Sequence, residues 1–356
     1  MKTLLSNRFG LGAQDVLPGL QPDQLKYIDE VKSKINKEFT LVPISCPCQK
    51  SGAKNDVVIS EIDRYGLPLQ SVLCNDCGTV RIDPYLDRDS LSDFYTNYYQ
   101  QMYGRSVDVG PYFEKQKNYG KKFYALTQLP LGSNILEFGC GAGGALDIFR
   151  AHGHNVYGIE YSQKLIDYGK SKGLSKLFYG SLQEFQEKNQ QIKFDLIYSN
   201  HVFEHISDPI NYLTTCIKML SSKGAIICSV PDLYNSHQYI FPNSNLKLMF
   251  HIAHIYNYSF QCLERMATQL GMKIERLFPN PDIRTATSDM PEIWFKISKE
   301  PAGNSQRSTA NNTNDYLGYL QHTEQNFNTG TGLLKTEEST GRKFKTFVKK
   351  IVKWRK

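Results

Sequence analysis

The chain has 356 residues, of which 40% are hydrophobic and 12% aromatic, enough for a sizeable core in two or three modules. Its formal net charge is +7, but residues 342–356 hold eight lysines and arginines, so the rest of the chain carries −1 and offers no broad basic surface to a nucleic acid. No signal peptide or transmembrane span is evident, and we expect a cytoplasmic protein.

The first 40 residues are expected to be mainly helical. Pro22 stands near the start of a helix predicted over residues 21–39, because Leu25, Ile28 and Val31 recur at helical spacing. Residues 1–40 are therefore interpreted as an N-terminal helical segment.

Residues 41–86 contain two cysteine pairs. Cys74 and Cys77 stand two residues apart and precede Gly78, and Cys46 and Cys48 stand one residue apart. Four thiolates at such spacing can surround one tetrahedral Zn²⁺, so we expect a small zinc-type module. The shorter first pair leaves open a site that uses one of its cysteines with another ligand, and reduced structural thiols are the alternative to a metal.

Residues 87–128 form a tyrosine-rich segment. Tyr95, Tyr98, Tyr99 and Tyr103 lie three or four residues apart, which places them on one face of a helix. We interpret the segment as a helical linker whose tyrosines form a packing seam between modules. The alternative is a lid over a substrate, since phenols supply both stacking area and hydrogen bonds.

Residues 129–300 alternate apolar strands with helical segments. This pattern predicts an α/β domain with a seven-stranded, mostly parallel sheet and helices on both faces. The last two strands follow a helix predicted over 259–270 and are expected to form a hairpin-like pair. The seven predicted strands cover residues 134–138, 154–160, 175–179, 194–200, 224–230, 272–279 and 291–298.

The first of these strands ends in a glycine-rich loop. Gly139, Gly141 and Gly143 permit a tight turn and a close backbone approach to a ligand, at the N-terminus of the helix that follows. The run also satisfies the dinucleotide fingerprint, so glycines alone do not separate NAD from S-adenosylmethionine. Glu137 favours the latter, because a carboxylate repels a pyrophosphate and attracts an amino group.

Acidic and polar residues end the next strands. Glu160 can accept hydrogen bonds from both ribose hydroxyls, a role that also fits NAD. The fourth strand ends at Asn200 and opens into a loop with His201 and His205, at the edge of the sheet where α/β enzymes place their chemistry.

Histidine is the usual proton acceptor near neutral pH, and four histidines are candidates. His201 and His205 follow the fourth strand, and His251 and His254 precede the 259–270 helix. Residues 201–205 also spell the inverted zinc-protease motif H-x-x-E-H, which needs a long helix; its place at a strand-to-loop exit argues against a protease.

In combination, the runs E-F-G-C-G-A-G-G, G-I-E and F-D-L-I-Y-S-N-H-V-F-E-H-I-S-D-P resemble the ordered motifs of the Rossmann-like S-adenosylmethionine-dependent methyltransferases, over roughly residues 119–299. The resemblance implies that Glu137, Gly139 and Gly141 hold the methionine part of the cofactor. The remaining cofactor residues that we assign are Gly143, Glu160, Tyr161, Ser181, Leu182 and Asn200. Many relatives have an acidic residue where this chain has Ser181.

The cysteine module, the tyrosine-rich linker and the catalytic domain together resemble a group of bacterial methyltransferases that act on sugars or small metabolites. We expect methyl transfer to a hydroxyl of a sugar or glycan precursor, with His201, His205 and His254 as catalytic candidates. The alternatives are an RNA methyltransferase and a catalytically inactive cofactor-binding scaffold.

Residues 301–356 are interpreted as a C-terminal tail. Residues 301–341 are predicted to be a flexible polar linker, with a short helix over 316–327. Residues 342–356 form a predicted basic amphipathic helix with an apolar face that includes Phe344 and Trp354, which suits an anionic membrane surface at the inner face of the cell membrane. Docking on a partner protein and a solvated tail are the alternatives.

Overall fold

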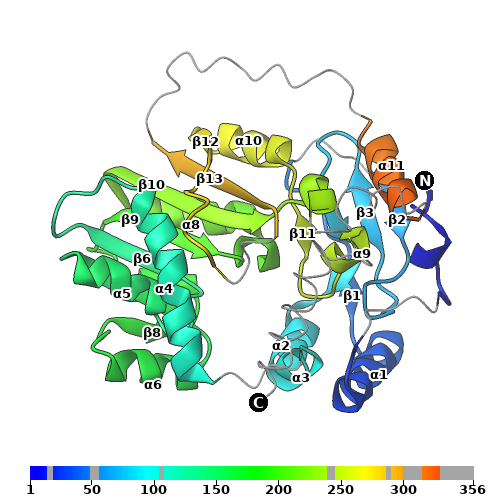
Figure 1. Ribbon diagram of the computed structural model, residues 1–356, viewed down its shortest axis with the longest axis horizontal. Helices are drawn as coiled ribbons and strands as arrows, with labels where there is room; N and C mark the ends of the chain where they lie inside the picture. Colours follow the sequence, from blue (N-terminus) through cyan, green and yellow to red (C-terminus); the bar gives the residue numbers. More distant parts are fainter. Residues whose placement is uncertain are drawn as a thin grey trace, which may run out of the picture.

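The computed structural model describes residues 1–13, 19–48, 56–103, 108–238, 245–285, 290–299 and 315–328. A seven-stranded sheet with its helices forms one part of the molecule, and a smaller part built mainly from the N-terminal region lies beside it (Figure 1). Among the described residues, no helix has the length and apolar character needed to cross a bilayer.

The large sheet confirms the predicted α/β class. Its strand order is β12-β13-β10-β9-β6-β7-β8, and within it only β13 runs antiparallel to its neighbours. The strands are β6 (Asn134–Phe138), β7 (Asn155–Glu160), β8 (Leu177–Tyr179), β9 (Phe194–Asn200), β10 (Leu220–Pro231), β12 (Lys273–Leu277) and β13 (Glu292–Ser298). The strand order reverses between β6 and β9, and ligands of open α/β sheets bind at the carboxyl ends of such a pair.

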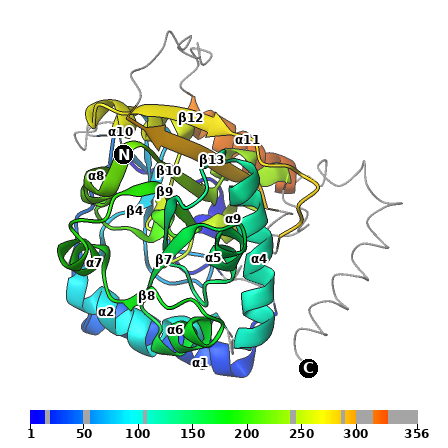
Figure 2. The ribbon, with the colours of Figure 1, turned by 90° about the vertical axis from the view of Figure 1, so that its left-hand side faces the viewer.

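Helices cover both faces of this sheet, as the alternation of elements predicts. In Figure 2, α4, α5 and α6 lie on one side of the sheet and α7, α8 and α10 on the other. The bounds of these helices are α4 (Val109–Ala125), α5 (Gly144–Ala151), α6 (Gln163–Ser171), α7 (Leu182–Lys188), α8 (Pro209–Met219) and α10 (Phe260–Gln269). The helix α4 lies within the segment predicted as a linker, yet it packs along α5 as part of the large α/β unit.

The N-terminal part is built around a small antiparallel sheet. Its strand order is β11-β4-β3-β2, and β1 pairs separately with β5. The elements are η1 (Asn7–Phe9), α1 (Pro22–Lys37), β1 (Leu41–Val42), β2 (Asp56–Ser60), β3 (Ser71–Cys74), β4 (Val80–Ile82), β5 (Tyr85–Leu86), α2 (Arg88–Asn97) and α3 (Tyr99–Met102). The helix predicted over 21–39 is therefore present as α1, with Gln21 as its N-cap.

One strand of the small sheet comes from far along the chain. Residues between β10 and α10 form η3 (Leu233–Gln238), α9 (Asn245–Met249) and β11 (Tyr256–Asn257). Because β11 pairs with β4, this insertion belongs in space to the N-terminal part, although the sequence places it inside the domain predicted over 129–300.

The C-terminal helix also joins the N-terminal part. The helix α11 (Tyr316–Asn328) lies beside the N-terminus (Figure 1), and the buried Glu324 accepts hydrogen bonds from Arg8 Nε at 2.6 Å and Ser6 Oγ at 2.8 Å. The short helix expected within the 301–341 linker is thus present and docked. The rest of that linker and the basic helix predicted over 342–356 lie outside the described residues.

Candidate functional site

The glycine loop after β6 turns sharply at the carboxyl edge of the sheet. Gly139 and Gly141 have φ values of 70° and 55°, which L-residues with side chains rarely adopt, and Gly143 is the N-cap of α5. A Cβ at Gly141 would lie 2.6 Å from both Tyr112 Oη and Gln116 Nε2. The loop is therefore a close-fitting backbone cradle at the N-terminus of a helix.

Two acidic residues flank this cradle. Glu160, at the end of β7, accepts hydrogen bonds from the amides of Gly141 at 2.9 Å and Tyr161 at 2.8 Å. Burial raises the pKa of Glu160, while these amide hydrogen bonds act in the opposite direction. Glu137 is buried in β6 and accepts a hydrogen bond from Tyr198 at 3.0 Å.

The protonation of Glu137 is shifted more strongly. Burial raises the pKa of this carboxyl well above its usual range; the hydrogen bond from Tyr198 lowers the pKa, and the charge of Glu160 raises it further. A cationic group beside Glu137 would offset the cost of burying the charge. The donor set thus fits a cofactor with an amino group near Glu137 and hydroxyls near Glu160.

The other residues predicted to bind cofactor are placed as follows. Asn200 ends β9, and its Oδ1 accepts a hydrogen bond from Ser229 Oγ at 2.7 Å. Tyr161 follows Glu160 with an exposed side chain. Ser181 is the N-cap of α7, where its hydroxyl accepts from the amide of Glu184, and Leu182 is buried. The Ser181 side chain therefore caps the first turn of α7.

Tyr112 and Gln116 on α4 are part of the site, although neither belongs to a recognisable sequence motif. The amide side chain of Gln116 accepts from the backbone N–H of Ala142 at 3.2 Å and donates to the carbonyl of Cys140 at 2.9 Å. Its Nε2 also lies 3.3 Å from Tyr112 Oη. A polar residue on the buried face of an amphipathic helix is the one sequence signal that points to Gln116.

His201 is held between two carboxylates. Its Nε2 lies 2.6 Å from Glu292 Oε1 and its Nδ1 lies 3.5 Å from Glu204 Oε1, in a backbone conformation with φ of 51°. Burial alone would lower the pKa of His201, but the two carboxylates outweigh burial and raise it to about 10. His201 is thus suited to hold a positive charge, and less suited to accept a proton at neutral pH.

The other three histidines form a cluster with two tyrosines. His205 Nδ1 lies 3.2 Å from Tyr95 Oη, and His251 Nδ1 lies 2.6 Å from Tyr103 Oη. The ring of His254 lies 4.8 Å from that of His205 and 3.7 Å from that of His251, centroid to centroid. Side chains from the strand exit after β9, the insertion and the tyrosine-rich segment thus meet at one place.

The tyrosine-rich segment packs its rings together, as the seam interpretation predicts, and its role as a lid stays a prediction. It forms two helices, α2 and α3, with Tyr98 at the junction, and the rings of Tyr95, Tyr99 and Tyr103 pack on one another at 5.0 and 4.6 Å. The rings form a seam, and two of the hydroxyls reach the histidine cluster.

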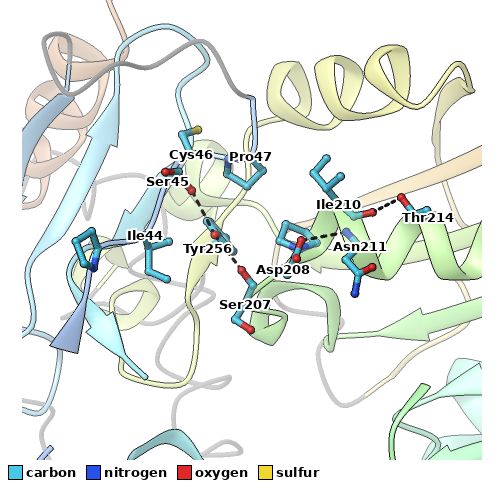
Figure 3. Close-up of a pocket in the computed structure, with 12 residues that line it drawn as sticks. Ile44, Ser45, Cys46, Pro47, Ser207, Asp208, Ile210, Asn211, Thr214 and Tyr256 are labelled. Carbon is cyan, nitrogen blue, oxygen red and sulfur yellow. Dashed lines mark hydrogen bonds between the residues drawn. The ribbon is translucent and has the colours of Figure 1, made fainter. Parts of the chain in front are cut away.

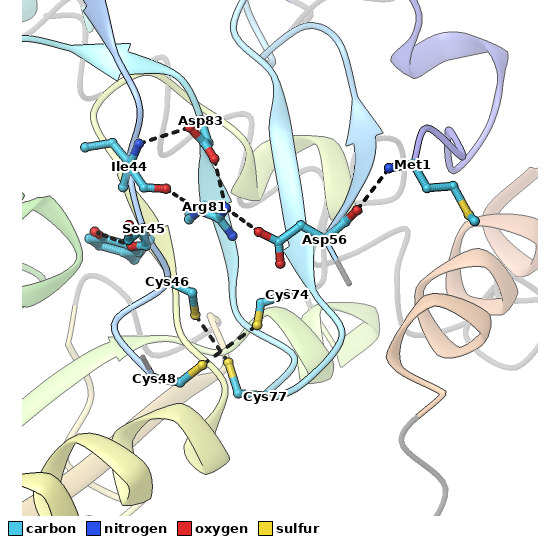
Figure 4. A network of polar contacts seen from close by, with 11 residues as sticks. Met1, Ile44, Ser45, Cys46, Cys48, Asp56, Cys74, Cys77, Arg81 and Asp83 are labelled. Carbon is cyan, nitrogen blue, oxygen red and sulfur yellow. Dashed lines mark hydrogen bonds and ion pairs between the residues drawn. The ribbon is translucent and has the colours of Figure 1, made fainter. Parts of the chain in front are cut away.

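The four module cysteines meet in the N-terminal part. Their sulfurs all lie within 4.8 Å of one another, with Cys46–Cys77 at 3.5 Å and Cys48–Cys74 at 3.8 Å (Figure 4). A tetrahedron with Zn–S bonds of about 2.3 Å has edges of about 3.8 Å, so this donor set fits Zn²⁺.

Neighbouring residues fix the two halves of this cysteine cluster. Arg81 on β4 is buried, donates to the Ile44 carbonyl at 2.7 Å, and forms ion pairs with Asp56 and Asp83 at 2.6 and 2.8 Å (Figure 4). Ser259, the N-cap of α10, donates to the carbonyl of Cys77. The cluster is thereby tied to a helix of the large sheet.

A cleft of about 510 Å³ opens between the two parts of the molecule (Figure 3). It is bordered by the Pro43–Pro47 segment and the start of α8, and Tyr256 Oη lies 3.4 Å from the carbonyls of both Ser45 and Ser207. None of the predicted cofactor-binding or catalytic residues lines it.

The sheet order, the glycine cradle and the acid after β7 define the class of the large domain: an α/β methyltransferase fold. Residues 114–277 match the family described as "Methyltransferase domain", which agrees with this fold class.

Relatives of known function resemble part of the chain. It is 29% identical over 111 residues to "Ubiquinone biosynthesis O-methyltransferase" of Coxiella burnetii, covering 30% of this chain and 47% of that protein. It is also 29% identical over 102 residues to the protein of the same name from Cereibacter sphaeroides, covering 28% of this chain and 41% of that protein. The chain thus matches about half the length of these relatives.

Among solved structures, a TehB-like SAM-dependent methyltransferase from Corynebacterium glutamicum is 18% identical, with a TM-score of 0.38 over 60% of this chain and 100% of that one.

Proposed function

We propose that the protein is an S-adenosylmethionine-dependent methyltransferase that methylates a hydroxyl of a sugar or glycan precursor. The observation that supports this most is the juxtaposition of the cofactor cradle and the histidine cluster. Val202 packs against Gly139, where a Cβ would come within 2.6 Å of Val202 Cγ2, so the loop that holds His201 and His205 lies directly on the glycine loop.

Glu137, Glu160 and the amides of the glycine loop would hold the cofactor. When bound, S-adenosylmethionine supplies a methyl group on a positively charged sulfur that leaves as a neutral thioether, so the acceptor's hydroxyl proton is all that the chain must remove.

The histidine cluster would remove this proton. His205 is oriented through Nδ1 by Tyr95, which leaves Nε2 to face the acceptor, and His254 lies beside it. His201, paired with Glu292, would position the strand exit and supply positive charge. The tyrosine rings beside the cluster offer stacking area and hydrogen bonds, which suits a sugar.

Zn²⁺ in the cysteine cluster is part of the proposal, as a structural ion. All four cysteines are buried and β11 of the insertion pairs with β4 of the N-terminal part, so the ion would stabilise the N-terminal part and with it the insertion that presents His251 and His254.

The proposal is tested with radiolabelled S-adenosylmethionine and separate pools of sugar precursors and RNA. We expect label in the sugar pool from the wild-type protein. His205→Asn should lower kcat by about 10²–10⁴-fold without changing cofactor affinity, because it removes only a proton acceptor. Exposed His152→Gln, on the far end of α5, is the matched control.

Label in RNA would support the alternative RNA methyltransferase, and cofactor binding without transfer to any pool would support a scaffold. Binding of the basic segment 342–356 to an anionic membrane remains a prediction from the sequence. Liposome flotation that is unchanged on deleting these residues would contradict it.

A further inference from the structure

A second cluster of metal-binding side chains lies at the histidine site, apart from the cysteines. One ligand atom each of Glu204, His205 and His254 lie within 4.8 Å of one another. Glu204 and His205 belong to η2 (Phe203–His205), and His254 lies in the insertion just before β11. The cluster therefore joins the strand exit of the large sheet to the N-terminal part.

Glu204 is the unusual member of this group. Its side chain is fully buried, yet neither carboxylate oxygen accepts a hydrogen bond from any residue in the described part of the chain. Two imidazole nitrogens pair with Oε1, His201 Nδ1 at 3.5 Å and His254 Nε2 at 3.7 Å. The ion pair with His201 offsets part of the cost of burying this carboxylate, and a cation on the side of His254 would offset more of it.

Neighbouring groups orient the histidines as metal ligands are commonly oriented. Tyr95 Oη contacts Nδ1 of His205 at 3.2 Å, which leaves Nε2 as the nitrogen available to a cation. His251, fixed through Nδ1 by Tyr103, packs its ring on that of His254. Such outer contacts hold the ring and tautomer of metal-binding histidines.

We propose that Glu204, His205 and His254 bind a divalent first-row transition-metal cation. Two imidazoles and one carboxylate suit Zn²⁺, Mn²⁺, Fe²⁺ or Co²⁺ and leave coordination positions open. This differs from the H-x-x-E-H arrangement that the sequence spells, because His201 is engaged by Glu292 and the third ligand comes from the insertion.

In the metal-bound protein the open positions would bind the acceptor's hydroxyl oxygen and lower its pKa, and His205 would then act as a ligand instead of as the base, with the released proton passing to solvent water. This role rests on the proposed function, whereas the binding of the cation does not.

The binding is tested with Mn²⁺, followed by the loss of the free-ion electron paramagnetic resonance signal. Mn²⁺ prefers oxygen and nitrogen over thiolate, so the cysteine cluster contributes little. We expect one equivalent bound by the full-length protein, and at least a tenfold loss of affinity in both Glu204→Gln and His254→Asn. His152→Gln should bind as the wild type does.

Calorimetry with S-adenosylhomocysteine shows whether each variant keeps its fold. Wild-type protein that binds no Mn²⁺ at millimolar concentration, or folded Glu204→Gln that binds it as tightly as the wild type, would overturn the inference. Mn²⁺ binding without methyl transfer would overturn the proposed function alone, and transfer by protein that fails to bind Mn²⁺ would overturn the metal site alone.

Discussion

At the scale of single residues, the cofactor cradle depends on how closely α4 approaches the glycine loop. Tyr112 and Gln116 fill the space where Gly141 would have a side chain, and Gln116 also satisfies backbone groups of the loop. Glycine is therefore required at position 141 for two reasons: its backbone conformation and the absence of a Cβ.

Gly141→Ala should weaken binding of S-adenosylhomocysteine at least tenfold, because the new methyl group meets Tyr112 and Gln116. Gly132→Ala is a matched control: Gly132 also has a positive φ, 79°, but nothing lies within 4 Å of its Cβ position. Calorimetric titration measures both, and equal affinities of the two variants would contradict the close-fit argument.

The buried carboxyl of Asp63 should make the stability of the protein depend on pH. It is fully buried and accepts amide hydrogen bonds from Tyr65 at 2.8 Å, Leu67 at 3.0 Å and Ile252 at 3.1 Å. Burial raises its pKa from 3.8 to about 6, and the amide hydrogen bonds and the charge of Arg64 oppose this shift. The folded state therefore binds the proton more tightly than the unfolded state.

Because the folded-state pKa is the higher one, the contribution of Asp63 is most favourable below pH 4 and is lost as the pH rises through 6. The difference in free energy of unfolding between the wild type and Asp63→Asn should change by about 2 kcal/mol between pH 4 and pH 7. Urea denaturation across this range measures it, with exposed Asp29→Asn as control. A difference independent of pH would refute the assignment.

At the scale of elements, the crossing of α4 and α5 sets the position of the cradle. Gly120 of α4 lies against Ala145 of α5, and Gly144 lies against the Phe113 carbonyl. The two helices thus meet backbone to backbone, which lets Gln116 reach the loop at the start of α5.

Gly120→Ala should destabilise the protein by about 1–3 kcal/mol, since its Cβ would overlap the carbonyl of Ala145 and lie 2.8 Å from Ala145 Cα. A Cβ at Gly110 on the same helix would meet the Tyr168 hydroxyl at 3.3 Å and Asp108 Oδ1 at 3.9 Å, so Gly110→Ala should change stability by less than about 1 kcal/mol. Thermal unfolding monitored by circular dichroism compares the two. Similar losses would show that helix propensity, rather than the crossing, dominates.

At the scale of the whole molecule, the two parts share elements and are not separate domains joined by a linker. The insertion after β10 completes the small sheet through β11, and Ser259 links α10 to Cys77. The histidine site lies where these parts meet, so its geometry depends on both.

Removing metal from the cysteine cluster should therefore impair the acceptor site more than the cofactor site. Cys74→Ser, or chelation under reducing conditions, should release one Zn²⁺, lower the melting temperature and raise KM for the acceptor several-fold, with little change in S-adenosylhomocysteine affinity. Cys216→Ala, a buried cysteine of α8 outside the cluster, should retain the metal. Mass spectrometry for zinc and steady-state kinetics measure these effects. Stoichiometric zinc in Cys74→Ser would contradict the assignment.

The sequence by itself determined the seven strands of the large sheet, the glycine loop and its flanking acids, because these rest on local periodicity and on short-range backbone chemistry. Only the tertiary structure decided that Gln116 supports the loop, that β11 and α11 join the N-terminal part, and that His201 pairs with Glu292 while Glu204 faces His254. Those contacts join segments far apart along the chain, and no local pattern records which distant partner a buried polar group will meet.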